Sequence, residues 1–140
     1  MTAKKIKMVE IDRTQYMNYQ LKAEEFYMAM LQAEKSEHWN AVGLNAVHCA
    51  ISMADALLVK FAGVRSISND HMVVVDLIRQ NLNINDIENK LNTLLRILAK
   101  KSLIEYDSVP FSKTDASDIA KQAERFYLWA RAELLKDKNI

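Results

Sequence analysis

The scarcity of turn-forming residues limits the possible folds of this chain more than any other feature. Only two glycines and one proline occur among its 140 residues. An all-β protein of this size needs a turn roughly every 8–12 residues, and this chain has too few residues of the required kinds. Half of the residues are hydrophobic and 26% are charged, as in a typical globular domain. We therefore expect a single all-α domain covering residues 1–140.

The spacing of apolar residues predicts where the helices lie. Apolar side chains recur every three or four positions along five segments, as on one face of an α-helix. Residues 1–12 lack this pattern and are expected to form a flexible arm. The prediction is an antiparallel helical bundle of four long helices and one short helix. We expect helices near residues 14–33, 39–61, 70–80 (the short one), from after 83 to between 100 and 106, and from about 113 into the 130s.

Polar residues and one glycine supply the expected helix ends. Gly63 is suited to follow the second helix, with a loop at residues 64–69 after it. Ser68 or Asn69 is expected to cap the short helix. Further caps are expected at Asn83, with Asp86 at the third position of its helix, and at Ser112 with Asp115, or Thr114.

Charge and cysteine content exclude several classes of protein. Nineteen basic and eighteen acidic residues give a net charge of +1, which predicts no global field for nucleic acid or membrane. Cys49, the single cysteine, is expected to be a buried thiol in a reducing compartment. Uncharged apolar runs are far too short for a membrane span, so a cytoplasmic protein without a membrane partner is expected.

The sequence contains no motif for metal binding, for a phosphate-binding loop or for covalent catalysis. None of the three histidines completes a Glu-x-x-His motif, and no Cys-x-x-Cys pair exists. His48 and Cys49 are helical neighbours whose side chains point about 100° apart, so they do not form a catalytic pair. We therefore expect neither a metal nor a cofactor.

A polar row accompanies the apolar stripe of the second helix. Asn45, His48, Ser52 and Asp55 recur at spacings of three and four and so share one side of that helix. This row is expected either to line a ligand groove or a symmetric interface, or to be an ordinary solvent-facing edge. The sequence leaves both interpretations open.

The segment that follows the leucine-rich fourth helix gathers several chemical groups. Residues 100–107 contain two lysines, a serine, a glutamate and a tyrosine. Lysines at a helix end complement its dipole, which is the simpler explanation. Alternatively, Lys101 and Tyr106 bind a phosphate or carboxylate between them.

Several short pieces of the chain occur in a characteristic order. They are the alanine-rich helix Ala46–Leu58, Asn69-Asp70-His71 before an apolar helix, Leu94-Leu95-Arg96 followed by Lys101-Ser102 and Glu105-Tyr106-Asp107, and Ser117-Asp118-Ile119-Ala120 with Ala123 and Phe126-Tyr127. Together they resemble the HEPN family of small helical bundles. The resemblance covers about Tyr16 to Leu135.

The resemblance implies a homodimer with a polar cleft at its interface. Many HEPN proteins are metal-independent endoribonucleases, including toxins and phage-defence proteins, while others bind nucleotides or act as partners. Catalytic members carry an Arg-x4–6-His motif in which a polar residue usually follows the arginine. The matching positions here are Lys101, Ser102 and Tyr106, so both key residue types are replaced. A lysine lacks the planar fork of arginine, and a phenol with a pKa near ~10 is a poor general base.

The combined expectation is a dimeric HEPN-like module without efficient catalysis. It would bind a nucleotide, an RNA or a protein partner such as a nucleotidyltransferase. One alternative is a ribonuclease with a divergent motif that uses Lys101, Ser102, Tyr106 and either His48 or His71. Another is a purely structural helical dimer. The near-neutral charge weakens tight RNA binding but permits a small nucleotide. The expected cleft residues are Asn45, His48, Ser52, Asp55 and His71.

Overall fold

The computed structural model describes residues 8–68 and 70–136. Helices dominate this part of the chain, which confirms the all-α class in its broad form. The elements in chain order are β1 (Met8–Glu10), the 3-10 turn η1 (Arg13–Gln15), α1 (Tyr16–Lys35), α2 (Trp39–Ala62), β2 (Val64–Ser66), α3 (Met72–Asn81), α4 (Ile87–Leu98), α5 (Lys101–Tyr106) and α6 (Lys113–Leu135).

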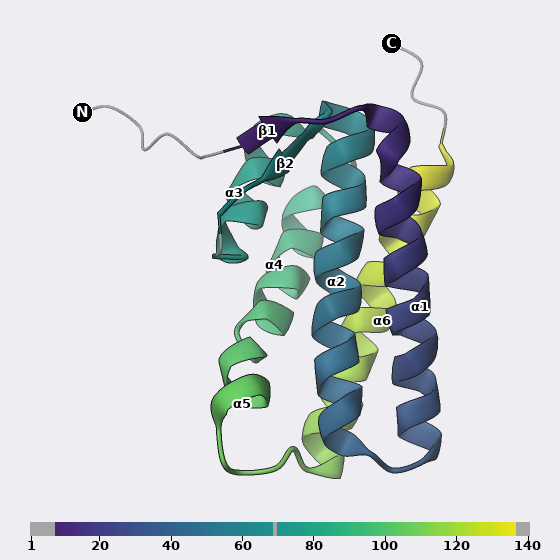
Figure 1. Cartoon of the computed structure of the whole chain (residues 1–140), viewed down its shortest axis with the longest axis vertical. Coiled ribbons are helices and arrows are strands. Elements are labelled where there is room, and N and C mark those ends of the chain that lie inside the picture. Colours follow the sequence, from purple (N-terminus) through teal and green to yellow (C-terminus); the bar gives the residue numbers. More distant parts are fainter. Residues whose placement is uncertain (1–7, 69, 137–140) are drawn as a thin grey trace, which may run out of the picture.

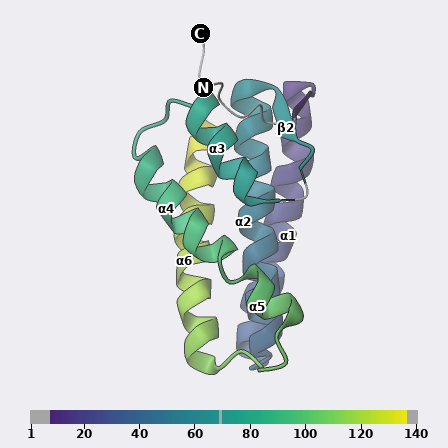
Figure 2. The ribbon, with the colours of Figure 1, turned by 90° about the vertical axis from the view of Figure 1, so that its left-hand side faces the viewer.

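The helix α2 forms the centre of the molecule. It packs mainly against α1 and α6, which lie beside it along the long axis (Figure 1). The shorter helices α3, α4 and α5 follow one another along another side of the molecule. In Figure 2, α3 and α5 stand in front of α2, while α4 lies in front of α6. Because α2 has neighbours on several sides, fifteen of its residues are buried, and several of these are alanines that allow close helix approach.

The long apolar helix α2 has the length and composition of a membrane span. The sequence analysis missed this, because it considered only uncharged runs. Most of the apolar part of α2 is nevertheless buried inside the molecule, as in the core helix of a soluble protein. Its membrane-like composition therefore follows from its central position and is weak evidence for a membrane location.

Several predicted helix ends are confirmed. The Ser112 hydroxyl accepts a hydrogen bond from the Asp115 N–H, and the Asp115 carboxylate accepts one from the Ser112 N–H, which completes a capping box for α6. Gly63 ends α2 with a φ of 63°, a left-handed conformation that glycine adopts without steric cost. The bounds of α1, α2 and α6 lie within two or three residues of the prediction.

The start of the chain and the loop after α2 differ from the prediction. Residues 1–7 of the expected arm, and the candidate cap Asn69, lie outside the described residues. Met8–Glu10, however, pair antiparallel with Val64–Ser66, with Val9 opposite Arg65. A three-residue strand carries too little periodicity to be recognised, and its partner lies more than fifty residues away in the sequence.

The starts of α3 and α4 also lie later than predicted. The helix α3 begins at Met72, whose N–H donates to the Asp70 carboxylate at 3.0 Å, so Asp70 rather than Ser68 supplies this hydrogen bond. The helix α4 begins at Ile87 rather than after Asn83, and Asp86 takes a left-handed conformation before it. The intervening Ile84 is buried in the core, and this tertiary contact overrides the local capping signal.

A separate short helix, α5, explains why the end of the fourth predicted helix could not be placed from the sequence. The helix α4 ends at Leu98, and a separate helix of six residues follows. The segment that connects it to α6 returns to α2 at Gly43, where a Cβ atom would lie only 2.8 Å from the Phe111 ring and 3.1 Å from Ile104. Gly43 therefore permits this close approach.

Candidate functional site

A small pocket lies where the start of α3 meets the end of α4 and the start of α5. Its volume is about 190 Å³. Two expected motif residues, Lys101 and Ser102, and the expected cleft residue His71 contribute to its lining. The full lining consists of Asp70, His71, Met72, Leu98, Lys101 and Ser102.

An ion pair on α5 orients the lysine of this pocket. The Lys101 ammonium donates to the Glu105 carboxylate at 3.0 Å, one helical turn away, and both side chains are partly buried. The hydrogen bond from Lys101 holds the pKa of Glu105 below its usual range. An ammonium has three donors, so Lys101 keeps donors for a ligand.

The surroundings of the pocket favour the neutral form of its histidine. Burial lowers the pKa of His71, and the neighbouring Lys101 and His48 lower it further, while Glu105 and Asp70 act in the opposite direction. A neutral imidazole has one donor and one acceptor nitrogen. His71 is therefore suited to donate to an anion or to accept a proton near neutral pH.

The polar row of α2 is not an open solvent-facing edge. Ser52 and Asp55 each retain 8% of their exposure, and Asn45 and His48 are partly buried. The Asn45 amide donates to the Ala41 carbonyl of its own helix at 2.9 Å. The His48 ring lies against Phe26 of α1, with 5.4 Å between the ring centroids. The row therefore faces neighbouring elements rather than bulk water.

Burial has a marked effect on the carboxyl group of the row. It raises the pKa of Asp55 to about 6, although the cations of Arg65 and Lys22 act in the opposite direction. These cations come from β2 and α1, and both lie near the ring of Tyr19. Asp55 therefore belongs to a cluster drawn from three elements.

The structure brings together most, but not all, of the expected site residues. His71, Lys101 and Ser102 share the pocket. His48 is close enough to influence the pKa values of His71 and Glu105. Tyr106 does not line the pocket and is 81% exposed. The reason is helical geometry, because the five residues from Lys101 to Tyr106 correspond to about one and a half turns of α5.

Sequence reasoning missed several residues of the two clusters. Asp70 lines the pocket, and its position just before an apolar helix was read only as part of a family motif. Lys22 and Arg65 act on Asp55, and both lie near the ring of Tyr19. No local signal connects these three residues, because their proximity depends on how α1 and β2 pack against α2.

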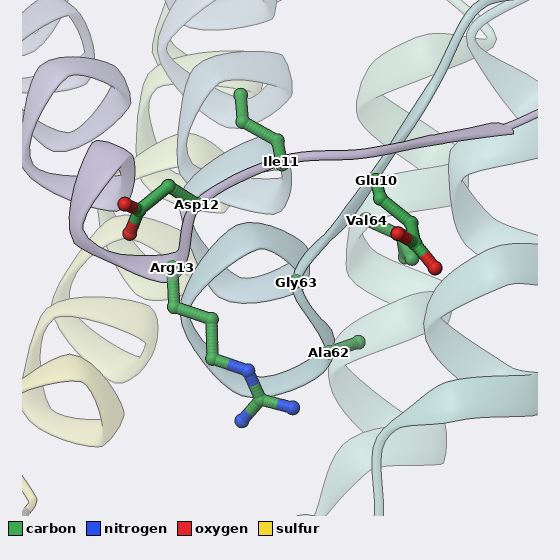
Figure 3. Close-up of a pocket in the computed structure, with 7 residues that line it drawn as sticks. All are labelled: Glu10, Ile11, Asp12, Arg13, Ala62, Gly63 and Val64. Carbon is green, nitrogen blue, oxygen red and sulfur yellow. The ribbon is translucent and has the colours of Figure 1, made fainter.

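A larger hollow, of about 530 Å³, lies at the other end of α2, between the start of the chain and Gly63. The Asp12 carboxylate turns away from it in Figure 3 and accepts two hydrogen bonds from Thr14. The Arg13 side chain extends past Gly63 along the hollow (Figure 3). Because the Asp12 carboxylate already serves the local turn, we regard this hollow as a weaker candidate. It is lined by residues 10–13 and 62–64.

Comparisons with known proteins do not assign the chain to a family. No family model matches it, and no significant match occurs among curated proteins or solved structures. Within residues 8–68 and 70–136, no three His, Cys, Asp or Glu side chains are grouped so that they could hold a metal ion. The functional argument therefore depends on the geometry of the chain itself.

Proposed function

We propose that this protein is a HEPN-like helical module that binds the phosphate group of a nucleotide or RNA without cleaving RNA efficiently. The observation that carries the proposal is the pocket in which Lys101, Ser102 and His71 converge from two separate parts of the chain. A cation, a hydroxyl and an imidazole together suit an anionic oxygen cluster. The resemblance to HEPN proteins, in which the same region of the sequence holds the motif, supports the same assignment.

The size and charge of the pocket define what it can accept. At about 190 Å³ it is smaller than the ~300–1,000 Å³ typical of small-molecule sites, so it suits one phosphoryl group rather than a whole nucleotide. Glu105 and Asp70 place two carboxylates nearby, which limits the affinity for anions. Asp70 is partly engaged, because its carboxylate accepts the Met72 N–H. We therefore expect weak binding of phosphate alone and tighter binding of a larger ligand.

Efficient cleavage of RNA requires a general base that the motif positions do not supply. Tyr106 stands outside the pocket, and a phenol does not ionise near neutral pH. General base catalysis usually contributes about 10²–10⁴-fold. The replacement of the family's histidine therefore favours binding over catalysis.

A ribonuclease with a divergent motif is the second candidate, and one observation favours it. His71 lies in the same pocket as Lys101, and burial lowers its pKa, which favours the neutral imidazole. A neutral imidazole can remove a proton from a ribose hydroxyl. In this alternative His71, rather than Tyr106, replaces the missing histidine.

The proposal includes a fold arrangement and a homodimer. We assign the four long helices of an antiparallel bundle to α1, α2, α4 and α6. Exposed apolar side chains support an interface: Met17, Leu21 and Met28 of α1 are 58–61% exposed. Light scattering should give about twice 16.1 kDa, and a monomer that persists at high concentration would contradict the dimer. A cytoplasmic location and a protein partner such as a nucleotidyltransferase complete the proposal.

An NMR titration and a cleavage assay test this function. Inorganic phosphate or AMP should shift the amide resonances of His71, Lys101 and Ser102, and Lys101→Ala should abolish the shifts. The matched control is Lys100→Ala, which removes the neighbouring exposed lysine and should leave the shifts intact. Absence of any shift at these residues would contradict the proposal.

The cleavage assay separates the two candidates. The wild-type protein should cleave RNA slowly or not at all without metal. Robust cleavage that is lost in His71→Ala and retained in Tyr106→Phe would establish the ribonuclease alternative. Cleavage lost in both Lys101→Ala and Tyr106→Phe would instead restore the motif positions as the catalytic pair.

A further inference from the structure

The charges around the pocket at Lys101 set a condition on any anion that binds there. Asp70 lines the pocket together with His71 and Lys101, and Glu105 is paired with the Lys101 ammonium at 3.0 Å. Two carboxylates therefore accompany one ammonium, and burial lowers the pKa of His71, which favours its neutral form. Each carboxylate repels an anion that carries no proton. The surroundings thus favour an anion that can also donate a hydrogen bond.

The backbone N–H groups at the start of α3 are already used within that part of the chain. The Met72 N–H donates to the Asp70 carboxylate at 3.0 Å, and the Val73 N–H donates to the Asp70 carbonyl at 3.0 Å. Donors to an anion therefore come from side chains, above all from Lys101 and Ser102 at the start of α5. The specificity of the pocket consequently depends on its side chains rather than on the end of a helix.

Asp70 gives the pocket an acceptor in addition to these donors. Its Oδ1 atom accepts the Met72 N–H. A carboxylate has about four lone-pair sites on its two oxygens, so it can accept a further hydrogen bond. Asp70 precedes α3, whereas Lys101 and Ser102 begin α5, so the acceptor and the donors border the pocket from separate elements. The pocket can therefore contact one ligand group that both accepts and donates hydrogen bonds.

We propose that the pocket is specific for a phosphate monoester and that Asp70 is the residue that determines this specificity. The inference rests on the proposed function, since it takes the phosphoryl group to lie at Lys101. A phosphate monoester has a second pKa of about 6, so part of it carries a proton near neutral pH. This P–OH group can donate to the Asp70 carboxylate while the other oxygens accept from Lys101 and Ser102. An internal phosphodiester and a sulfate ion carry no such proton, and each would place an acceptor against the carboxylate.

This specificity narrows the class of ligand. The internal phosphates of RNA are diesters, so the selected ligand is a free mononucleotide or the phosphorylated end of an RNA chain. The pocket volume of about 190 Å³ fits a terminal phosphoryl group, which has only one ester substituent. A ribonuclease that acts within a chain must instead hold a diester. A preference for monoesters therefore supports binding over cleavage.

NMR titrations of the full chain at pH 6 with four small anions test the role of the proton. The anions are inorganic phosphate, methyl phosphate, dimethyl phosphate and sulfate. Phosphate and methyl phosphate should bind about 10–100-fold more tightly than the other two, as expected for one hydrogen bond to a charged group. Dimethyl phosphate is a monoanion, so charge repulsion alone does not explain weak binding of this probe. The shifts should be centred on His71, Lys101 and Ser102.

Two variants and a control assign the preference to Asp70. Asp70→Asn and Asp70→Ser both introduce residues that cap helices well, but they remove the carboxylate. Sulfate should then bind as tightly as phosphate. Asp76→Asn removes an exposed carboxylate of α3 that does not line the pocket, and it should leave the preference unchanged. Thermal unfolding confirms that each variant is folded, and the comparison of anions on the wild-type protein keeps the test decisive if a variant does not fold.

A pair of oligonucleotides identifies the source of the phosphate. An RNA trinucleotide with a 5′-phosphate should bind more tightly than the same trinucleotide with a 5′-hydroxyl group. Binding of the phosphorylated trinucleotide that is tighter than that of AMP would assign the phosphate to an RNA end. Binding that is no tighter would assign it to a free mononucleotide. Equal binding of the two trinucleotides would overturn the preference for a monoester.

Failure of this inference is distinguishable from failure of the proposed function. The inference is wrong if sulfate or dimethyl phosphate binds as tightly as phosphate, or if the preference persists in both Asp70 variants. If phosphate still shifts Lys101 and His71 in that case, the proposed function stands. If none of the anions or nucleotides shifts these resonances, both proposals are wrong.

Discussion

The two regions that carry the candidate site differ in what holds them in place. The polar row belongs to α2, which is buried by its neighbours along most of its length. The Lys101 end belongs to α5, a helix of six residues of which none is buried. Because packing buries most of α2, a polar side chain there that has no hydrogen-bond partner lowers the free energy of unfolding. A polar side chain on α5 would instead be hydrated. Polar residues are therefore more informative about function in α2 than in α5.

The largest expected effect measures how differently the two helices are packed. Leu57→Ala in α2 removes a fully buried side chain and should lower the free energy of unfolding by about 2–5 kcal/mol. Leu103→Ala in α5 removes a side chain that is 45% exposed and should cost at most about 0.5 kcal/mol. Urea denaturation monitored by circular dichroism measures both. Similar costs for the two variants would contradict the contrast.

A second prediction concerns the cost of the buried carboxyl group. Burial raises the pKa of Asp55 from 3.8 to about 6 in the folded protein, so the folded state binds its proton more tightly than the unfolded state does. The ionised carboxyl therefore destabilises the fold above pH 6, by up to about 3 kcal/mol at 1.36 kcal/mol per pKa unit. Asp55→Asn should raise stability at pH 7.5, and this gain should disappear as the pH falls toward 4.

Denaturant titrations at several pH values test this effect. The control Asp118→Asn, at an exposed site, should show little dependence on pH. A loss of stability in Asp55→Asn at pH 7.5 would show that the carboxylate has a stabilising partner. A residue that lowers the stability of a folded protein is often kept because it serves the function of the protein.

The contact at Gly43 is the place where the two regions meet. Gly43→Ala would place a methyl group 2.8 Å from the Phe111 ring, which must then move. The gain in helix propensity of Ala over Gly, about 1 kcal/mol, offsets part of the overpacking cost. We therefore expect a small net loss of overall stability. Hydrogen exchange in α5 should nevertheless become faster, while exchange at the centre of α2 stays unchanged.

Glu105→Gln should have the smallest effect on stability and a large effect on the binding of phosphate. Glu105→Gln removes the carboxylate partner of Lys101 on the partly exposed helix α5. Its unfolding midpoint should remain close to that of the wild type, since such pairs contribute little to stability. Phosphate should bind more tightly, because the competing negative charge is gone. Weaker binding of phosphate would show that Glu105 serves mainly to orient Lys101.

The long helices were predictable because local signals agree with the final packing. In α6, the apolar face and the cap at Ser112 indicate the same helix. In α2, the apolar face and the glycine at position 63 do so as well. The predicted start of α4 was wrong, because burial of Ile84 overrides the capping signal of Asn83. The strand pair was not predicted for a different reason: a strand of three residues is too short to show a recognisable alternation of apolar and polar residues.

The site was predictable only where its residues lie on one helix. The spacing of Ser52 and Asp55 placed them on one side of α2, but it could not show that this side is buried. The assignment of Tyr106 followed a family motif, but Tyr106 does not line the pocket and its side chain acts on Glu105 instead. The cations around Asp55 come from α1 and β2, so only the tertiary structure reveals them.

The short strand pair has a mechanical consequence. Val9 pairs with Arg65, and the Ile11 N–H donates to the Gly63 carbonyl at 2.9 Å, so the chain is attached to the end of α2 before α1 begins. An antiparallel pair pulled from the Met8 end opens one residue pair at a time, in the manner of a zipper. A stretching force applied at the start of the chain would therefore release the strand that carries Arg65 before it loads any long helix. Tension on this protein would be felt first beside Asp55, while the helical core remains intact.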